Sequence, residues 1–351
     1  MRTGHIITAA AVAFSAAAQP TSMEFVTIGD PGNIGYNNIN DFGFPTAFEG
    51  RGSVDYRYRI TTQEVSTREW LEFFNLFVAQ DPAFERILDP NRWGADPIFP
   101  GSTTNRVHEL QSFSFAADIP IAVSFRQATM YLNWLHNGQT SDPASLESGV
   151  YDVSTFTENP DGTRNDQIEP SPGARFRLPT VDEFLKAGFY DPDKNGEGPG
   201  WWEYGHSSDE LPVPGLPGEG GETISGVPES VREAAFEGIS ATEFPLNQYP
   251  DVTSPWGLLD INGGNREVLA DLSDVAAFAD LRWRFFWQAR NSNAPPSDSD
   301  YRADLGLQGS AMPASGLYSF RIVTAIPSPG VGSVLAFGAL TPGLLWRRRR
   351  A

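Results

Sequence analysis

The chain has 351 residues, 40% of them hydrophobic and 12% aromatic, which is enough to bury a sizeable core. Its net charge of −19 argues against a nucleic-acid partner, because phosphate binding needs a basic face. The absence of cysteine excludes disulfides, thiolate metal sites and thiol nucleophiles, and 34 Gly with 28 Pro predict many loops.

Residues 1–18 have the pattern of a bacterial export signal. Arg2 provides the positive start, residues 6–18 form an apolar run, and Ala16 to Ala18 offer the small residues that a signal peptidase requires. A buried N-terminal helix is the alternative interpretation. We expect an exported protein whose mature chain begins at Gln19.

Two strands and a capped helix are predicted next. Residues 25–30 and 54–60 have strand patterns, and a Gly/Asn-rich loop joins them. Ser66 and Glu69 have the spacing of a capping box, in which each side chain accepts the other residue's backbone N–H. The helix that follows carries apolar residues at i, i+3, i+4, i+7 and i+8, which we interpret as core rather than as a ligand platform: Trp70, Phe73, Phe74, Phe77 and Val78.

Two further helices are predicted to begin with a capping box. Ser124 with Gln127 opens one, and Asn137-Gly138 closes it. Thr180 with Glu183 opens the other, directly after a short strand at 175–178. The residues expected to face inward are Ala128, Tyr131, Leu132 and Leu135 in the first, and Phe184, Leu185 and Phe189 in the second. Asp191-Pro192 is expected to stop the second helix.

The remaining body is predicted to be mostly loop. Residues 158–171 and 206–230 are polar and rich in Pro and Gly, so we expect surface loops. An apolar stretch with a Gly-Gly-Asn turn at 263–265 follows. A short strand at 319–323 is expected to end the domain.

The last 26 residues, 326–351, have the pattern of a sorting signal. A Pro-Ser-Pro-Gly motif precedes an apolar stretch that ends at Trp346, about one bilayer of helix, and four arginines follow. This order resembles the PEP-CTERM class of bacterial sorting signals, which implies an exosortase-like transpeptidase as processing partner. A plain single-pass anchor is the alternative. Both place the body outside the cell, where loss of the two ends leaves a net charge of −24.

Five short motifs, taken together and in order, resemble the formylglycine-generating enzyme (sulfatase-modifying factor) family. Members of that family run E-V-T, V-S-W-x-D-A, R-L-P-T, G-L-x-D-M-x-G-N-V-W-E-W and G-F-R. In this chain the motifs stand as Glu64 to Ser66, Val123 to Ala128, Arg177 to Thr180, Gly257 to Asn265 and Ser319 to Arg321. The resemblance covers about residues 25–325. It implies one loop-rich α+β domain related to C-type lectin-like folds.

The resemblance also implies a copper site that this chain has lost. Catalytic members hold copper with two cysteines in a C-x4-C arrangement, and soft thiolates are the ligands that select Cu(I). The matching positions here are Arg282 and Trp287, so no copper is expected. Ala289, Arg290 and Asn293 of the surrounding segment are retained, while Arg266 to Leu269 replace the usual V-W-E-W and displace the family's glutamate.

An acidic turn after the third capped helix is the candidate metal site. Asp191, Asp193 and Asn195, followed by Gly196, place oxygen ligands on alternate residues, as in the opening of a calcium loop. Position twelve is Trp202 instead of glutamate, so this is not an EF-hand. A similar sequence at this turn occurs in exported relatives of the family. The alternatives are a calcium site and an ordinary polar turn.

Other chemistry has weaker support. His108, His136 and His206 lack metal-ligand spacing, so each is expected to be a surface or satisfied core histidine. Glu183 is explained by its helix cap, and Glu64 is expected to pair with an interior arginine.

The sequence therefore favours an exported, surface-sorted, non-catalytic domain that binds an envelope polysaccharide or protein, or serves a structural role. An oxidoreductase of the same superfamily with a different metal is the alternative. A groove lined by exposed aromatic residues such as Trp201, Trp202 and Trp287 would favour binding.

Overall fold

The computed structural model describes residues 23–37, 50–157, 160, 165–210, 245–247, 250–261, 266–272 and 318–326, with short strands at 214–215, 223–224, 227–228, 231–232, 284–287 and 308–309. The predicted export signal at 1–18 and nearly all of the predicted sorting signal at 326–351 lie outside these residues. Within them, no helix is both long and apolar enough to cross a bilayer.

The described elements form a mixed α+β fold with short strands. The helices are α1 (Thr67–Val78), α2 (Glu85–Leu88), α3 (Phe125–His136) and α4 (Val181–Phe189), with 3₁₀ turns η1 (Pro82–Phe84), η2 (Ala116–Asp118), η3 (Pro143–Leu146), η4 (Val153–Thr155) and η5 (Lys194–Gly196). The strands are β1 (Phe25–Ile28), β2 (Tyr58–Thr61), β3 (Ala95–Pro97), β4 (His108–Leu110), β5 (Phe176–Arg177), β6 (Tyr190–Asp191), β7 (Gly200–Trp201), β8 (Pro214–Gly215), β9 (Thr223–Ile224), β10 (Val227–Pro228), β11 (Val231–Arg232), β12 (Arg266–Leu272), β13 (Arg284–Trp287), β14 (Gln308–Gly309), β15 (Tyr318–Ser319) and β16 (Val323–Ala325).

All three predicted capping boxes are confirmed. The cap residues Ser66, Ser124 and Thr180 each accept the N3 backbone N–H, and the N3 side chain returns to the cap's own N–H at 2.8–2.9 Å. Each box satisfies two backbone donors that a helix start would otherwise leave without a partner. The positions of α1, α3 and α4 therefore follow from local sequence.

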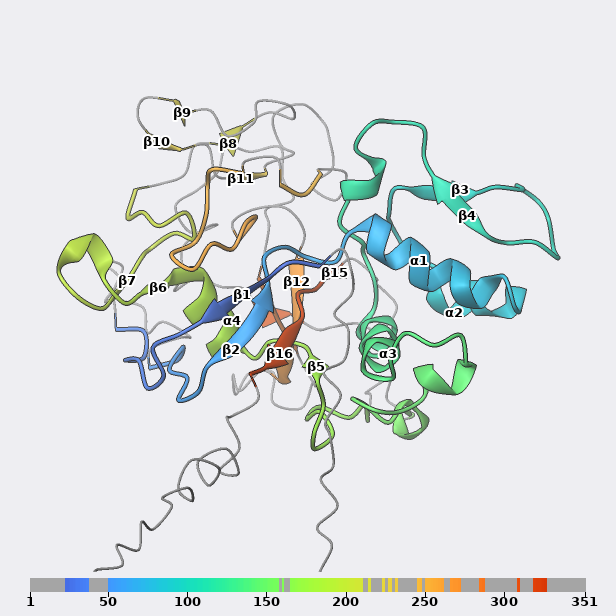
Figure 1. The fold of residues 1–351 in the computed structure, drawn as a ribbon, viewed down its shortest axis with the longest axis horizontal. Coiled ribbons are helices and arrows are strands. Elements are labelled where there is room, and N and C mark those ends of the chain that lie inside the picture. The colour runs from blue at the N-terminus through green and yellow to red at the C-terminus, as the bar shows by residue number, and fades with distance from the viewer. Residues whose placement is uncertain are drawn as a thin grey trace, which may run out of the picture.

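A four-stranded antiparallel sheet, in the order β1-β2-β16-β5, separates two apolar clusters. The cluster on one side contains the aromatic stripe of α1 and the inner face of α3, and the other contains α4. In Figure 1 the sheet lies centrally, with α4 to its left and α1 and α3 to its right. The inward-facing residues predicted for all three helices are buried. Each cluster is stabilised mainly by removal of this apolar surface from water.

A second sheet, in the order β14-β13-β12-β15, lies against the first and corrects the prediction for residues 319–323. We expected one strand there, but the chain pairs as β15 with β12 and only later, as β16, with β2. The residues between these strands cross from one sheet to the other. This crossing places the Arg321 side chain in the interior. In a continuous strand, successive side chains would instead alternate between the two faces of one sheet.

Two other boundaries differ from expectation. Strand β2 starts four residues later than predicted, because Val54 is held by the preceding loop: its N–H donates to Asn33 Oδ1 at 3.0 Å and its carbonyl accepts from Gly32 N–H at 2.8 Å. The segment predicted as a surface loop from 206 onward starts with a buried residue, His206, and contains β8, β9 and β10.

Candidate functional site

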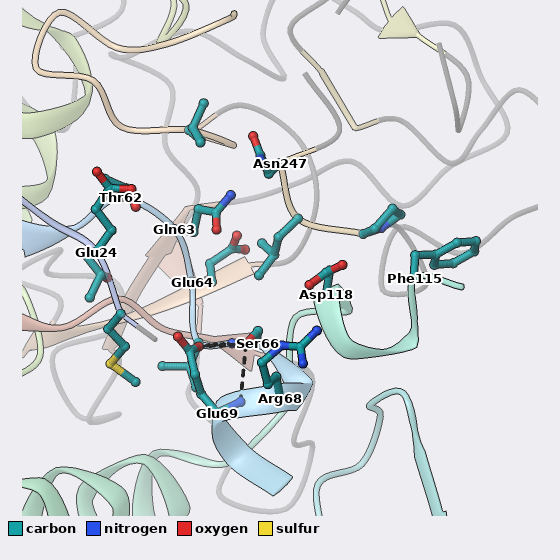
Figure 2. A pocket seen from close by; sticks show the side chains of 16 residues that line it. Glu24, Thr62, Gln63, Glu64, Ser66, Arg68, Glu69, Phe115, Asp118 and Asn247 are labelled. Carbon is teal, nitrogen blue, oxygen red and sulfur yellow. Dashed lines mark hydrogen bonds between the residues drawn. The ribbon is translucent and has the colours of Figure 1, made fainter. Parts of the chain in front are cut away.

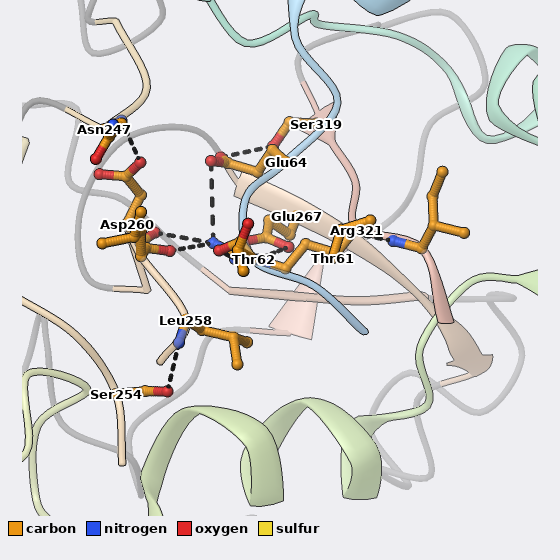
Figure 3. Close-up of polar contacts among 12 residues, drawn as sticks. Thr61, Thr62, Glu64, Asn247, Ser254, Leu258, Asp260, Glu267, Ser319 and Arg321 are labelled. Carbon is orange, nitrogen blue, oxygen red and sulfur yellow. Dashed lines mark hydrogen bonds and ion pairs between the residues drawn. The ribbon is translucent and has the colours of Figure 1, made fainter. Parts of the chain in front are cut away.

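A fully buried arginine organises the region where the two sheets meet. Arg321 Nε donates to both carboxylate oxygens of Glu267 at 2.9 and 3.1 Å, and its other nitrogens donate to the carbonyls of Thr62, Leu259 and Asp260. Figure 3 shows these groups converging on the guanidinium. Because a buried charge is tolerated when it is paired and hydrogen-bonded, this arginine fixes three chain segments around one point.

Glu64 is the second carboxylate at this point, as the sequence predicted. Its Oε2 lies 4.0 Å from Arg321 Nη2, both side chains are fully buried, and Ser319 Oγ donates to Oε1 at 3.0 Å. Glu267, which falls where the family motif has another residue, thus has a structural role. Three of the five motifs meet here, since Glu64, Glu267 and Arg321 belong to or adjoin the first, fourth and fifth.

Above this cluster is a polar pocket of about 550 Å³, here called the Glu64 pocket. It is lined by Met23, Glu24, Thr61, Thr62, Gln63, Glu64, Val65, Ser66, Arg68, Glu69, Phe115, Asp118, Pro245, Leu246, Asn247 and Leu259. Figure 2 shows these side chains gathered from the start of α1, the turn before it, η2 and the 245–247 segment. Four of the lining residues are acidic and one is basic, so the pocket repels anions.

Several polar groups in the Glu64 pocket are uncommitted. Among the described residues, the side chains of Glu24, Gln63, Asp118 and Arg68 form no hydrogen bond or ion pair, whereas Glu69 is engaged by its helix cap. The floor is rigid: Leu259 N–H donates to the Thr62 carbonyl at 2.9 Å. A fixed floor with free donors and acceptors above it is the arrangement of a ligand site.

A larger cavity of about 920 Å³ lies beside the β3–β4 hairpin and is here called the hairpin groove. It is lined by Glu85, Asp89, Pro90, Asn91, Arg92, Trp93, Ala95, Asp96, Pro97, Arg106, His108, Gln111, Phe113, Phe115 and Ile119. Phe115 lines both cavities, so the Glu64 pocket and the hairpin groove adjoin at this ring.

The charges of the hairpin groove are unequally neutralised. Arg106 and Glu85 form two charge-assisted hydrogen bonds of 2.5 Å, and so largely cancel each other. The carboxylate of Asp89 has no such partner among the described residues. Partial burial, together with the charge of Glu85, raises the pKa of Asp89 above its usual value, and the nearby His108 and Arg106 only partly oppose this shift. Asp96 is a third acidic residue of the groove and Arg92 a second basic one, so the lining carries one more acidic than basic side chain.

The R-L-P-T motif forms a separate, structural cluster at the start of α4. Arg177 and Glu183 are joined by two hydrogen bonds, and Tyr56 donates to Glu183 at 3.0 Å. Burial, followed by the Glu183 charge, raises the pKa of Tyr56 to about 12. The carboxylate that caps α4 thus also neutralises the arginine of the preceding strand. This cluster holds α4 in place and lines neither cavity.

The predicted calcium residues lie together in the turn between β6 and β7. The carboxylate of Asp191 already accepts two bonds, from the Asp193 backbone N–H at 2.9 Å and from Trp202 Nε1 at 3.1 Å. Asn195 has φ of 58°, and Lys194 reaches Asp209 at 2.6 Å. No group of three or more His, Cys, Asp or Glu side chains able to hold a metal occurs in the described part of the chain. Calcium binding at this turn stays a prediction.

Calcium at this turn is expected to raise the melting temperature at millimolar concentration, since extracellular calcium sites bind with Kd of about 10⁻⁴ to 10⁻³ M. At about 1 mM calcium, such a Kd would add about 0.4 to 1.4 kcal/mol to the free energy of unfolding. Asp193→Ala should remove most of the difference between calcium and chelator in a thermal melt. Identical curves for the unmodified protein would identify an ordinary turn.

The aromatic residues expected to line a groove are placed differently. Trp201, whose exposure in a groove would have favoured binding, is buried between Tyr36 and Tyr190. Gly52 packs against it with φ of 83°, where a Cβ would lie 2.3 Å from the indole. Trp202 is half-buried. Of the two positions that match the family's copper cysteines, Arg282 lies outside the described residues and Trp287 ends β13.

The exposed aromatic residues of the site are ones that the sequence interpretation missed. Phe113 and Phe115, which line the hairpin groove, are 39% and 40% exposed. No local signal marked them, because the alternation of serine and phenylalanine at 112–115 is the pattern of a half-buried strand, in which the phenylalanines would face the core.

The histidines follow the expectation in part. His108 is a satisfied core residue, with Nδ1 bonded to the Arg106 carbonyl at 2.8 Å. His136 Nδ1 accepts from Arg175 N–H at 3.1 Å. His206 is buried with neither ring nitrogen hydrogen-bonded among the described residues, so it is neither a surface residue nor satisfied.

Comparisons with known proteins give distant structural likenesses. No protein-family model matches the chain, and no curated protein matches it. The solved structure of Treponema denticola variable protein 1 is 16% identical with a TM-score of 0.47, covering 87% of this chain and 95% of that one. CarF is 16% identical with a TM-score of 0.45, covering 87% and 99%, and PvdO from Pseudomonas aeruginosa is 13% identical with 0.40, covering 87% and 92%. These likenesses are too distant to carry an argument about family or function.

Proposed function

We propose that this chain is an exported, non-catalytic binding module of the cell envelope, and that its ligand lies in the Glu64 pocket and the adjoining hairpin groove. The observation that carries the proposal is the set of uncommitted polar side chains, Glu24, Gln63 and Asp118, above a floor that Arg321 makes rigid. A pre-formed site of this kind binds its ligand without the entropic cost of ordering its own side chains.

Several finer assignments belong to the same proposal. Residues 25–325 form a formylglycine-generating-enzyme-like domain related to C-type lectin-like folds, which is supported by five motifs in order. Residues 326–351 are a PEP-CTERM-like signal for an exosortase-like enzyme, supported by the Pro motif, apolar span and arginine tail. The loss of cysteine at Arg282 and Trp287 is the reason to propose binding instead of copper-dependent oxidation.

Site-specific photo-crosslinking tests the binding proposal. Asn247 is exposed and lines the Glu64 pocket, and Glu197 is exposed at the end of η5, on the α4 side of the sheet. A photoreactive residue at position 247 should crosslink to an envelope polysaccharide or protein in intact cells, and the same residue at position 197 should not. Equal crosslinking at both positions would show that the pocket has no special role.

An activity assay separates binding from catalysis. The purified protein should not convert the cysteine of a sulfatase peptide to an aldehyde, with or without added copper, because no thiolate is available to hold the metal. Metal analysis of the same preparation serves as the control. Turnover above a metal-free control, or a stoichiometric tightly bound transition metal, would favour an oxidoreductase of the superfamily.

A further inference from the structure

The free charges of the Glu64 pocket are of both signs. Glu64 is engaged by the buried arginine beneath it, and Glu69 by the cap of α1. The exposed carboxylates of Glu24 and Asp118 and the exposed guanidinium of Arg68 remain, and among the described residues none of these three forms an ion pair or hydrogen bond. A ligand of one charge sign would meet a like charge on one of these groups. The pocket is therefore better matched to an uncharged ligand.

The hydrogen-bonding capacities of the same side chains narrow the ligand further. The ionised carboxylates of Glu24 and Asp118 only accept, the guanidinium of Arg68 only donates, and the carboxamides of Gln63 and Asn247 do both. Figure 2 shows Glu24 and Gln63 on one side of the pocket and Asp118 and Arg68 on the other. A hydroxyl is the uncharged group that satisfies all of these, because its oxygen accepts while its hydrogen donates. The pocket matches a ligand with hydroxyls on more than one edge.

A peptide fits the Glu64 pocket less well than a saccharide. Among the described strands only β2 contributes a lining residue, Thr61, and β2 is paired on both sides by β1 and β16. No free strand edge is therefore offered there for main-chain pairing with an added peptide strand. Val65 and Leu246 are buried, so they present little apolar surface to a peptide side chain. Phe115 at the edge accepts the apolar face of either ligand.

We infer that the ligand of the Glu64 pocket is a neutral saccharide, the end or a branch of an envelope polysaccharide with adjacent free hydroxyls. This inference rests on the proposed binding function and names its ligand class. Hydroxyls of the sugar donate to the carboxylates of Glu24 and Asp118, and their oxygens accept from Gln63 and Arg68. A volume of about 550 Å³ lies in the range of small-ligand sites, so the pocket takes a short oligosaccharide.

Binding of the whole purified protein to immobilised oligosaccharides tests this. The probes are neutral oligomers of glucose, mannose, galactose and N-acetylglucosamine; oligogalacturonate and oligolysine are the charged comparison ligands. At least one neutral oligomer should bind, and its affinity should change less than twofold between about 0.05 and 0.5 M salt, because no net charge attraction is involved. Asp118→Ala should weaken that binding about tenfold, and Asp118→Asn about fivefold, since hydrogen bonds to charged groups are the stronger ones.

A matched control separates the pocket from the rest of the acidic surface. Glu197→Gln removes one exposed charge on the α4 side of the sheet and should change the affinity less than twofold. Equal weakening by Glu197→Gln and Asp118→Asn would overturn the inference, and so would binding of the charged ligands alone. Absence of binding to every neutral oligomer, with a protein crosslinked at position 247, would also overturn it yet leave the proposed binding function intact. Failure of that crosslink would instead remove the binding function itself.

Discussion

Replacing Arg321 with methionine is expected to lower the free energy of unfolding by about 3–5 kcal/mol, the range seen when one partner of a buried ion pair is removed. The change removes the guanidinium that pairs with the buried carboxylates of Glu267 and Glu64. It also removes the donors to the carbonyls of Thr62 and Leu259. Both losses impose desolvation costs that methionine cannot offset.

Thermal and urea unfolding measure this effect. Arg68→Met is the matched control, since Arg68 is exposed and forms no ion pair or hydrogen bond among the described residues, and it should change stability by less than about 0.5 kcal/mol. Adding Glu267→Gln to Arg321→Met should recover part of the loss, because one of the two buried carboxylate charges disappears. Equal stability of Arg321→Met and the unmodified protein would show that the buried cluster does not hold the two sheets together.

Acidification is expected to destabilise the protein through His206. Burial lowers the pKa of His206 from its usual 6.5 to about 4, so the folded state resists the proton that the unfolded state accepts. Stability from this residue is full above pH 6.5 and falls as pH decreases through 4. The 2.5-unit difference corresponds to about 3 kcal/mol.

The measurement is the free energy of unfolding from pH 7 to pH 4 for the unmodified protein and for His206→Leu. The variant should lose much less stability over this window. At pH 7 it should be at least as stable, because both ring nitrogens are buried without a hydrogen-bond partner in the described structure. His136→Gln is the control. Burial also lowers the pKa of His136, but this ring differs from His206 because it is hydrogen-bonded and only partly buried. Parallel pH profiles for the unmodified protein and His206→Leu would contradict the assignment.

Local sequence was sufficient to predict the three capped helices and part of the core. A capping box acts over three residues and an apolar stripe over eight, so both can be read directly from the chain. Ser66, Ser124 and Thr180 cap their helices as predicted, and the stripe from Trp70 to Val78 is buried. The pairing of Glu64 with an interior arginine was also predicted, although the partner was not named.

Local sequence could not locate the candidate site, because its parts are distant along the chain. The switch between sheets after Ser319 depends on two pairings, with β12 and with β2, that no window around residue 320 contains. The same holds for Trp201, whose burial depends on Tyr36 and Gly52 from another part of the chain.

The sequence by itself determined the net acidic charge, the absence of thiolate chemistry and the starts of α1, α3 and α4, since each follows from residue type or from contacts within a few residues. The tertiary structure alone decided that Arg321 pairs with Glu267, 54 residues away, and that Ser319 bonds Glu64, 255 residues away. It also decided which phenylalanines remain exposed. Exposure and long-range pairing depend on how the sheets and helices pack together, because burial is a property of the assembled fold and not of any one segment.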